Sequence, residues 1–96
     1  MDLTTFRSSL ADAEPAAGLT LPLQTLWWDA KGDWNRAHAC AQQDEGATGA
    51  LVHAFLHRRE GDLANAGYWY RRAGRPMFEG SLEAEWTALA QELLGA

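Results

Sequence analysis

The sequence contains a single cysteine, Cys40, among its 96 residues. One cysteine excludes an internal disulfide framework, which is common in small secreted proteins, and favours a reducing compartment such as the cytoplasm. The first residues, MDLTTFRSSL, lack the basic segment and apolar run of a signal peptide. No apolar stretch approaches the ~18 residues that a membrane-spanning helix needs. We therefore expect a cytoplasmic protein that has no membrane partner.

Positive charge is also scarce. Lys and Arg total 8 residues against 13 Asp and Glu, so the net charge is −5. An acidic chain has no general affinity for polyanions, and we do not expect a nucleic-acid partner. Apolar residues nevertheless make up 47% of the chain and include five tryptophans, whose large rings help a small domain to build a core. This length and composition predict one globular domain.

Apolar residues recur at spacings of three and four, which predicts an all-α fold with about six helices and no strand. Leu3, Phe6 and Leu10 show this spacing in the first expected helix, at residues 2–12. Glycine or proline residues interrupt the pattern between helices, as expected for residues that end them. The remaining helices are expected at residues 21–31, 33–43, 49–60, 62–73 and 82–94.

These helices are expected to form two hairpins with a capping helix on either side. Thr20 is a candidate N-cap of the second helix, and Ser81 is a candidate N-cap of the last. The single domain, residues 1–96, would then comprise a capping helix in 1–18, hairpins in 20–45 and 46–76, and a second capping helix in 79–95.

Two Gly-Asp pairs mark an internal repeat. Gly61-Asp62 follows Gly32-Asp33 at an offset of 29 residues, and Ala66 matches Ala37 at the same offset. A glycine in the left-handed conformation ends one helix, and the aspartate accepts hydrogen bonds from the free amides that begin the next. The small alanine lets the paired helices approach closely.

This order of glycine, aspartate and small residues resembles the tetratricopeptide repeat. The resemblance is good for residues 47–76 and weak for residues 21–43, and the offset is shorter than the family's usual one. The residues that carry it are Ala54-x3-Arg58-x2-Gly61-Asp62-x3-Ala66-x3-Tyr70-x2-Ala73-x2-Pro76. It implies stacked antiparallel helix pairs, a short α-solenoid, that bind a protein partner. The stretch HRREGDLANAGYWYRRAG is also similar to a segment of small bacterial proteins, which implies a bacterial source but no activity.

His53 and His57 are spaced four residues apart, so their rings lie on one face of a helix and could share a metal ion. Zinc needs further ligands, and the nearest candidates, Glu60 and His38, complete no established motif. We therefore interpret the histidines as packed between helices, and we expect no metal and no cofactor. Cys40 is interpreted as a buried structural thiol.

Five of the eight basic residues are arginines close together in the chain: Arg58, Arg59, Arg71, Arg72 and Arg75. Arginines beside aromatic rings suit an anionic ligand or an acidic partner peptide. The last helix offers the favoured alternative, because its glutamates could neutralise the arginines within the molecule. Tyr70 is expected in the core, whereas Tyr68 and Trp69 point to other faces.

Two functions are compatible with these features. The favoured one is a non-enzymatic interaction module that binds a protein partner or itself as a homo-oligomer. The alternative is a small-ligand-binding protein or enzyme with a polar site around His53, His57, Arg58 and Tyr68, although no residue is assigned a catalytic role. The candidate ligand or partner contacts are His53, His57, Arg58, Glu60, Asn65, Tyr68, Trp69, Arg71 and Arg72.

Overall fold

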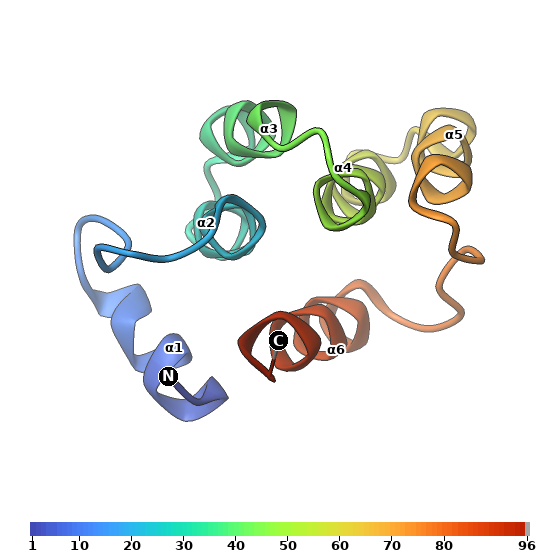
Figure 1. Cartoon of the computed structure of the whole chain (residues 1–96). Helices are drawn as coiled ribbons and strands as arrows, with labels where there is room; N and C mark the ends of the chain where they lie inside the picture. Colours follow the sequence, from blue (N-terminus) through green and yellow to red (C-terminus); the bar gives the residue numbers. More distant parts are fainter. Residues whose placement is uncertain (96) are drawn as a thin grey trace.

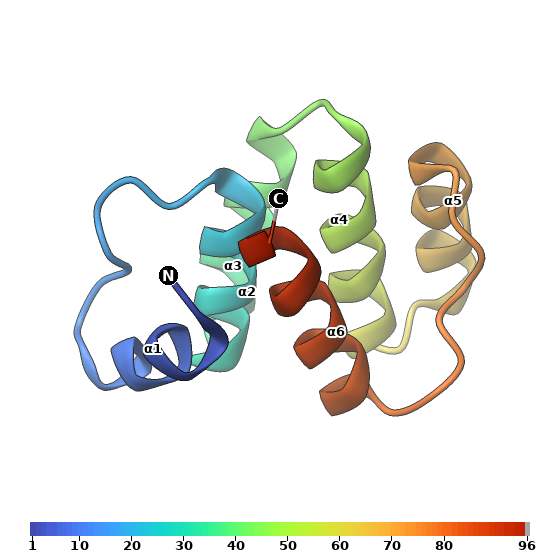
Figure 2. The ribbon, with the colours of Figure 1, turned by 60° about the horizontal axis from the view of Figure 1, so that its bottom comes forward.

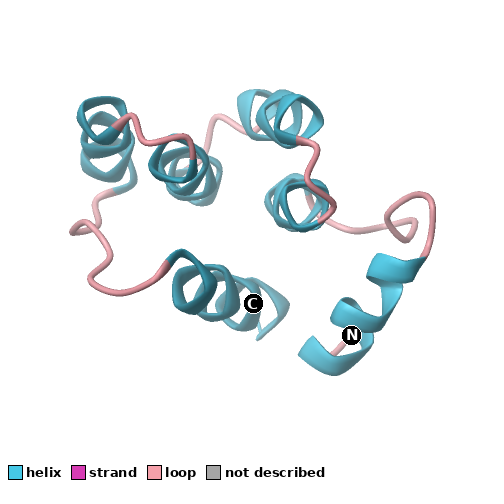
Figure 3. Ribbon diagram, turned by 180° about the vertical axis from the view of Figure 1, so that it is seen from behind, coloured by secondary structure: helices cyan, strands magenta, loops and turns pink. Residues whose placement is uncertain are grey.

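The computed structural model describes residues 1–95 and confirms the all-α class (Figures 1 and 3). These residues form six α-helices and no strand. No helix among them is both long and apolar enough to cross a membrane. The helices are α1 (Leu3–Ser8), which continues as a 3-10 turn (Ser9–Ala11), α2 (Leu21–Ala30), α3 (Trp34–Gln43), α4 (Ala47–Arg59), α5 (Leu63–Ala73) and α6 (Leu82–Gly95).

Both Gly-Asp pairs form the expected helix corners. Gly32 and Gly61 have φ angles of +80° and +85°, which strain any residue with a side chain. The Asp33 side chain accepts a hydrogen bond from the Arg36 amide at 3.0 Å, and Asp62 accepts one from the Asn65 amide at 3.1 Å. Each corner therefore ends one helix and begins the next within a few residues, so that α2 packs against α3 and α4 against α5.

The last helix does not extend this row of hairpins. It lies across the inner side, where it contacts α2, α4 and α1, while α3 and α5 lie on the outer side (Figures 1 and 2). The Trp86 indole, for example, donates to the Leu26 carbonyl oxygen at 2.9 Å. The core forms where α2, α4 and α6 meet, and its largest fully buried apolar side chains are Trp27, Phe6, Phe55, Leu26 and Leu56.

The N-cap of α2 and the start of α4 differ from the sequence prediction. The Thr20 side chain makes no capping bond; instead the Gln24 side chain donates to the Leu19 carbonyl oxygen at 2.8 Å. Helix α4 begins at Ala47, two residues before the predicted start, and Gly49 in its first turn passes very close to Asp44. A Cβ atom on Gly49 would lie 2.2 Å from the Asp44 carbonyl oxygen, so only glycine fits within this first turn. Ser81 caps α6 as expected, accepting from the Ala84 amide at 3.0 Å.

The arginines divide between internal ion pairs and the surface. Arg58 pairs with Glu85 at 2.8 Å and Arg75 pairs with Glu92, so α6 neutralises two of them as expected. Arg59 instead pairs with the buried Asp29 of α2 at 2.6 Å. Burial raises the pKa of Asp29, and the Arg59 guanidinium opposes this effect. Among the described residues, the exposed Arg71 and Arg72 have no ion-pair partner.

Tyr70 links α5 to α6, because its hydroxyl group donates to the buried Glu85 carboxylate. Burial first, and then this carboxylate, raise the pKa of the Tyr70 hydroxyl well above its ordinary value of 10.0. The folded protein therefore keeps a proton that the unfolded chain loses above pH 10, so stability decreases as the pH rises through that range.

We expect the free energy of unfolding to begin to fall above pH 9. Once the pH exceeds 10, it should fall by about 1 kcal/mol per pH unit, up to pH 11. Urea denaturation at a series of pH values measures this slope. Tyr70→Phe, which has no ionisable hydroxyl group, should show a much smaller slope. Equal slopes in the two proteins would contradict the assignment to Tyr70.

Candidate histidine site

Three side chains on the outer side of α4 form the candidate site. His53 and His57 come from adjacent turns of α4, and His38 reaches them from α3. The Nε2 atoms of His53 and His38 are 2.9 Å apart. The ring of His57 lies 4.9 Å from that of His53 and 5.5 Å from that of His38, measured between centroids. All three rings therefore meet at one place between α3 and α4.

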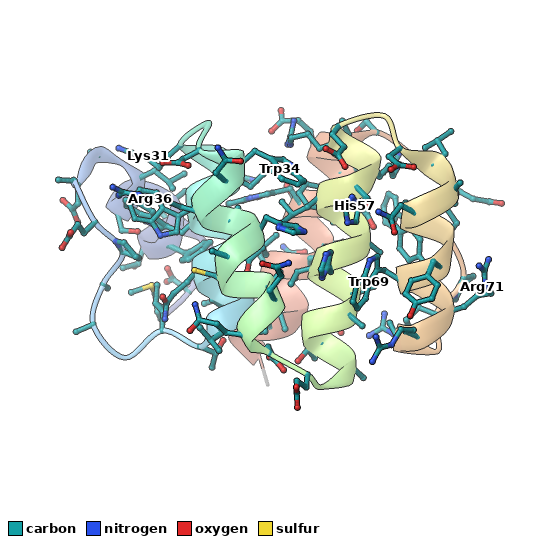
Figure 4. All side chains as sticks on the ribbon, turned by 90° about the horizontal axis from the view of Figure 1, so that it is seen from above. Lys31, Trp34, Arg36, His57, Trp69 and Arg71 are labelled. Carbon is teal, nitrogen blue, oxygen red and sulfur yellow. The ribbon has the colours of Figure 1, made fainter. Side chains whose placement is uncertain are left out.

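Two tryptophans hold the outer rings of this cluster. Trp34 stacks on His38 with centroids 4.6 Å apart, and Trp69 stacks on His53 at 3.8 Å. The Trp34 indole also donates to the Leu56 carbonyl oxygen at 3.0 Å, which fixes its position. Figure 4 shows Trp34, His57 and Trp69 along one strip between α3 and α5. The rings of His38 and His53 are therefore each packed against the face of a tryptophan.

His57 is oriented by a carboxylate. Its Nδ1 atom lies 2.6 Å from a Glu60 oxygen, so Nδ1 carries the proton and Nε2 keeps a free lone pair in the neutral ring. The Asn65 amide nitrogen lies 3.5 Å from Nδ1 and 3.4 Å from Nε2. Because it is almost equally far from both nitrogens, Asn65 is aligned neither with the Nδ1 proton nor with the Nε2 lone pair.

The surroundings keep His53 and His38 uncharged near neutral pH. The pKa of His53 is lowered to about 4, first by burial and then by the neighbouring His38, His57 and Arg72. Burial and His57 also lower the pKa of His38, although Glu60 opposes this effect. Neutral imidazoles have one free lone pair each, which can accept a proton, a hydrogen bond or a metal ion.

No family model, curated protein or solved structure matches this chain. The tetratricopeptide resemblance therefore stays a prediction, and the function has to be argued from the residues themselves.

A cleft of about 660 Å³ opens beside the histidine site. It lies between the loop that joins α3 to α4 and the last turns of α5. His53 and Trp69 are at its inner end, and Arg72 is at its rim, with its guanidinium 4.9 Å from the Trp69 ring. The other lining residues are Ala41, Gln42, Asp44, Glu45, Gly46, Ala47 and Ala50. The cleft gives solvent a path toward His53.

The structure brings together only part of the expected polar site. His53, His57, Glu60, Asn65 and Trp69 gather on the outer side of α4. Tyr68 packs edge-on against Trp69 but is exposed, as are Arg71 and Arg72.

Arg58 lies apart from this group, because it points to the inner side of α4 and binds Glu85 and the Gly80 carbonyl oxygen. Trp34 belongs to the site but was not predicted, and His38 was considered only as a further metal ligand. Their own spacing of four residues on α3, which parallels that of His53 and His57, is the signal that could have indicated them.

Proposed function

We propose that the protein is a non-enzymatic interaction module that binds a protein partner, or a second copy of itself, through the outer face of α5. One observation carries this proposal. Leu63, Tyr68 and Met77, on α5 and the segment after it, are 57%, 46% and 43% exposed, and the only other exposed large apolar residue described is Met1. Exposed large apolar side chains concentrated on one element favour contact with another protein.

The position of α5 in the row of helices supports the same surface. Helix α5 packs against α4 on one side, and no further helix covers its other side among the described residues (Figure 1). Row-like helical arrays need a polar capping element at such an end. Here Met77 lies over Gly67, whose missing side chain leaves the helix surface open to close approach. Arg71 and Arg72 flank this apolar surface without ion-pair partners.

The inner face is less suited to a partner because α6 already occupies it. A tetratricopeptide-like array would present α2 and α4 to a peptide, but here both contact α6. Trp86, Leu89 and Ala90 of α6 are buried there. A partner that used this face would first have to displace α6, so the outer face of α5 is the better candidate.

A photo-crosslinking amino acid tests the proposal directly. Ala64 is exposed on α5, and Ala11, at the end of the turn that follows α1, is an exposed control at the far end of the molecule. With p-benzoylphenylalanine at position 64, irradiation of extract from the source cells should give a discrete protein adduct that is absent with the probe at position 11. The adduct mass distinguishes a second copy from another protein. No adduct, or the same adducts from both positions, would refute the proposal.

The cleft beside His53 favours a second candidate function, the binding of a small ligand with or without catalysis. The cleft combines the uncharged His53 and the Trp69 ring at its inner end with the Arg72 guanidinium at its rim. These groups suit a ligand with both aromatic and anionic character. Arg58, on the inner side of α4, would take no part in such a site.

A further inference from the structure

All the histidines of this chain meet at one place. The sequence contains three, and a ring nitrogen of each lies within 4.8 Å of a ring nitrogen of the other two. His38 belongs to a different hairpin from His53 and His57, so only the packing of α3 on α4 unites them. From this geometry we propose that His38, His53 and His57 bind one divalent transition-metal ion, with Zn²⁺ as the best-suited ion.

The spacing of the nitrogens is close to that of a zinc site. Zinc binds histidine nitrogens at about 2.0–2.1 Å, so two ligands of a tetrahedral ion lie about 3.3 Å apart. The Nε2 atoms of His38 and His53 face each other at 2.9 Å. Slight separation of these two rings and a small approach of His57 would complete a three-nitrogen site. Because His53 and His57 are four residues apart on one helix, the helix backbone holds these two ligands next to each other.

The chemistry of the rings also fits. A metal ion needs uncharged imidazoles with free lone pairs. The Nε2 atoms of His38 and His53 lie within hydrogen-bond distance, so one of them carries a proton, and a shift of that proton to Nδ1 of the same ring frees both Nε2 lone pairs for the ion. Imidazole nitrogen suits Zn²⁺, Cu²⁺ and Ni²⁺, whereas Mg²⁺ and Ca²⁺ prefer oxygen ligands. Glu60 holds the Nδ1 proton of His57, which is the usual role of a carboxylate beside a zinc-bound histidine.

The site is also accessible to an ion from solvent, and it has room for the fourth ligand of a tetrahedral ion. His53 and His57 are only 4% and 6% exposed, so the site is sheltered, but His53 also lines the cleft. A three-histidine site leaves one tetrahedral position for a water molecule, which the cleft can supply. The inference concerns this cluster alone and does not depend on a partner for α5.

The test uses the full chain without a polyhistidine tag, stripped of metal by a chelator. Titration with ZnCl2 in a calorimeter should show one ion per chain, with a dissociation constant of about 10 µM or lower. MgCl2 should show no binding. Co²⁺ should give the visible absorption bands of tetrahedral coordination and broaden the NMR signals of all three histidine rings.

Two variants locate the ion. His38→Gln removes a ligand that is only half-buried, and it should weaken Zn²⁺ binding at least tenfold. Glu45→Gln removes a carboxylate from the same cleft and should leave the affinity unchanged. His57, Glu60 and Asp62 form a second group with ligand atoms within 4.8 Å, and that group does not include His38. Unchanged affinity in His38→Gln would therefore overturn the proposed ligand set.

Absence of Zn²⁺ binding at 100 µM would overturn the proposal as a whole. If circular dichroism shows that His38→Gln does not fold, the Co²⁺ spectrum and the histidine NMR signals of the unmodified protein determine whether the three histidines bind the ion. Broadening of fewer than three histidine signals would exclude the site. Loss of Zn²⁺ binding in His38→Gln with an unchanged crosslink from position 64 would separate this proposal from that of α5.

Discussion

Arg58→Ala should lower the free energy of unfolding by about 3–5 kcal/mol, because it leaves a buried carboxylate without its counter-charge. The Glu85 side chain is 1% exposed, and Arg58 lies 2.8 Å from it. Arg58 also donates to the Gly80 carbonyl oxygen just before α6 begins. A domain of this size is stable by only about 5–14 kcal/mol, so this loss is large. Urea denaturation followed by tryptophan fluorescence measures it.

A double variant separates the ion pair from the packing around it. Arg58→Met with Glu85→Leu replaces both charges by apolar side chains of similar size, and such replacements are often neutral or stabilising. It leaves the Tyr70 hydroxyl group without its acceptor, so Tyr70→Phe is added to remove that group as well. This triple variant should recover most of the stability that Arg58→Ala loses. A loss below about 1 kcal/mol in Arg58→Ala would contradict the buried-charge argument.

The sequence predicted the helices well because their ends depend on local chemistry. Each helix corner consists of a glycine with a positive φ angle, Gly32 or Gly61, and a capping aspartate beside it. Both features depend on neighbouring residues and can therefore be recognised in the sequence alone. The start of α4 was predicted two residues too late, because glycine is typical of turns and the turn was therefore expected to extend to Gly49. Nothing in the residue pattern around Gly49 indicates that its Cα passes against the Asp44 backbone.

The place of α6 was harder to predict. Its glutamates correctly indicated ion pairs with arginines, but charge alone does not say which helix supplies the partner. Glu85 finds Arg58 on α4, and it reaches α5 only through the Tyr70 hydroxyl group. Helix α6 thus turns inward onto α2 and α4 instead of covering α5. This inward position leaves the apolar surface of α5 uncovered.

The histidine site was predictable only where its residues lie on one helix. His53 and His57 share one helix, so their proximity follows from helical geometry. His38 joins them across the α3–α4 contact, which depends on how closely and at what angle two helices pack. The stacking of Trp69 on His53 depends likewise on the packing of α5. Spacing along one helix indicates which side chains share a face, but it does not say which helix packs against that face.

Trp86→Ala should destabilise the protein by about 3–5 kcal/mol, because Trp86 joins α6 to two other helices. Its indole donates to the Leu26 carbonyl oxygen of α2 at 2.9 Å, and its ring stacks on Phe6 of α1 with centroids 5.8 Å apart. The Arg7 guanidinium covers the same ring at 5.3 Å. Loss of the ring leaves a cavity at the point where the N-terminal and C-terminal helices meet. Thermal and urea denaturation measure the loss.

Two further variants show whether volume or hydrogen bonding dominates at this position. Trp86→Phe keeps an aromatic ring but loses the indole donor, so it should cost only about 1–2 kcal/mol. Leu94→Ala changes a half-buried side chain on the same helix and should cost less than Trp86→Ala. Because α6 covers the inner face, Trp86→Ala should also make α6 the first site of limited proteolysis. Equal losses in the free energy of unfolding from Trp86→Ala and Leu94→Ala would show that contacts along the whole of α6 stabilise its position, and not chiefly the Trp86 ring.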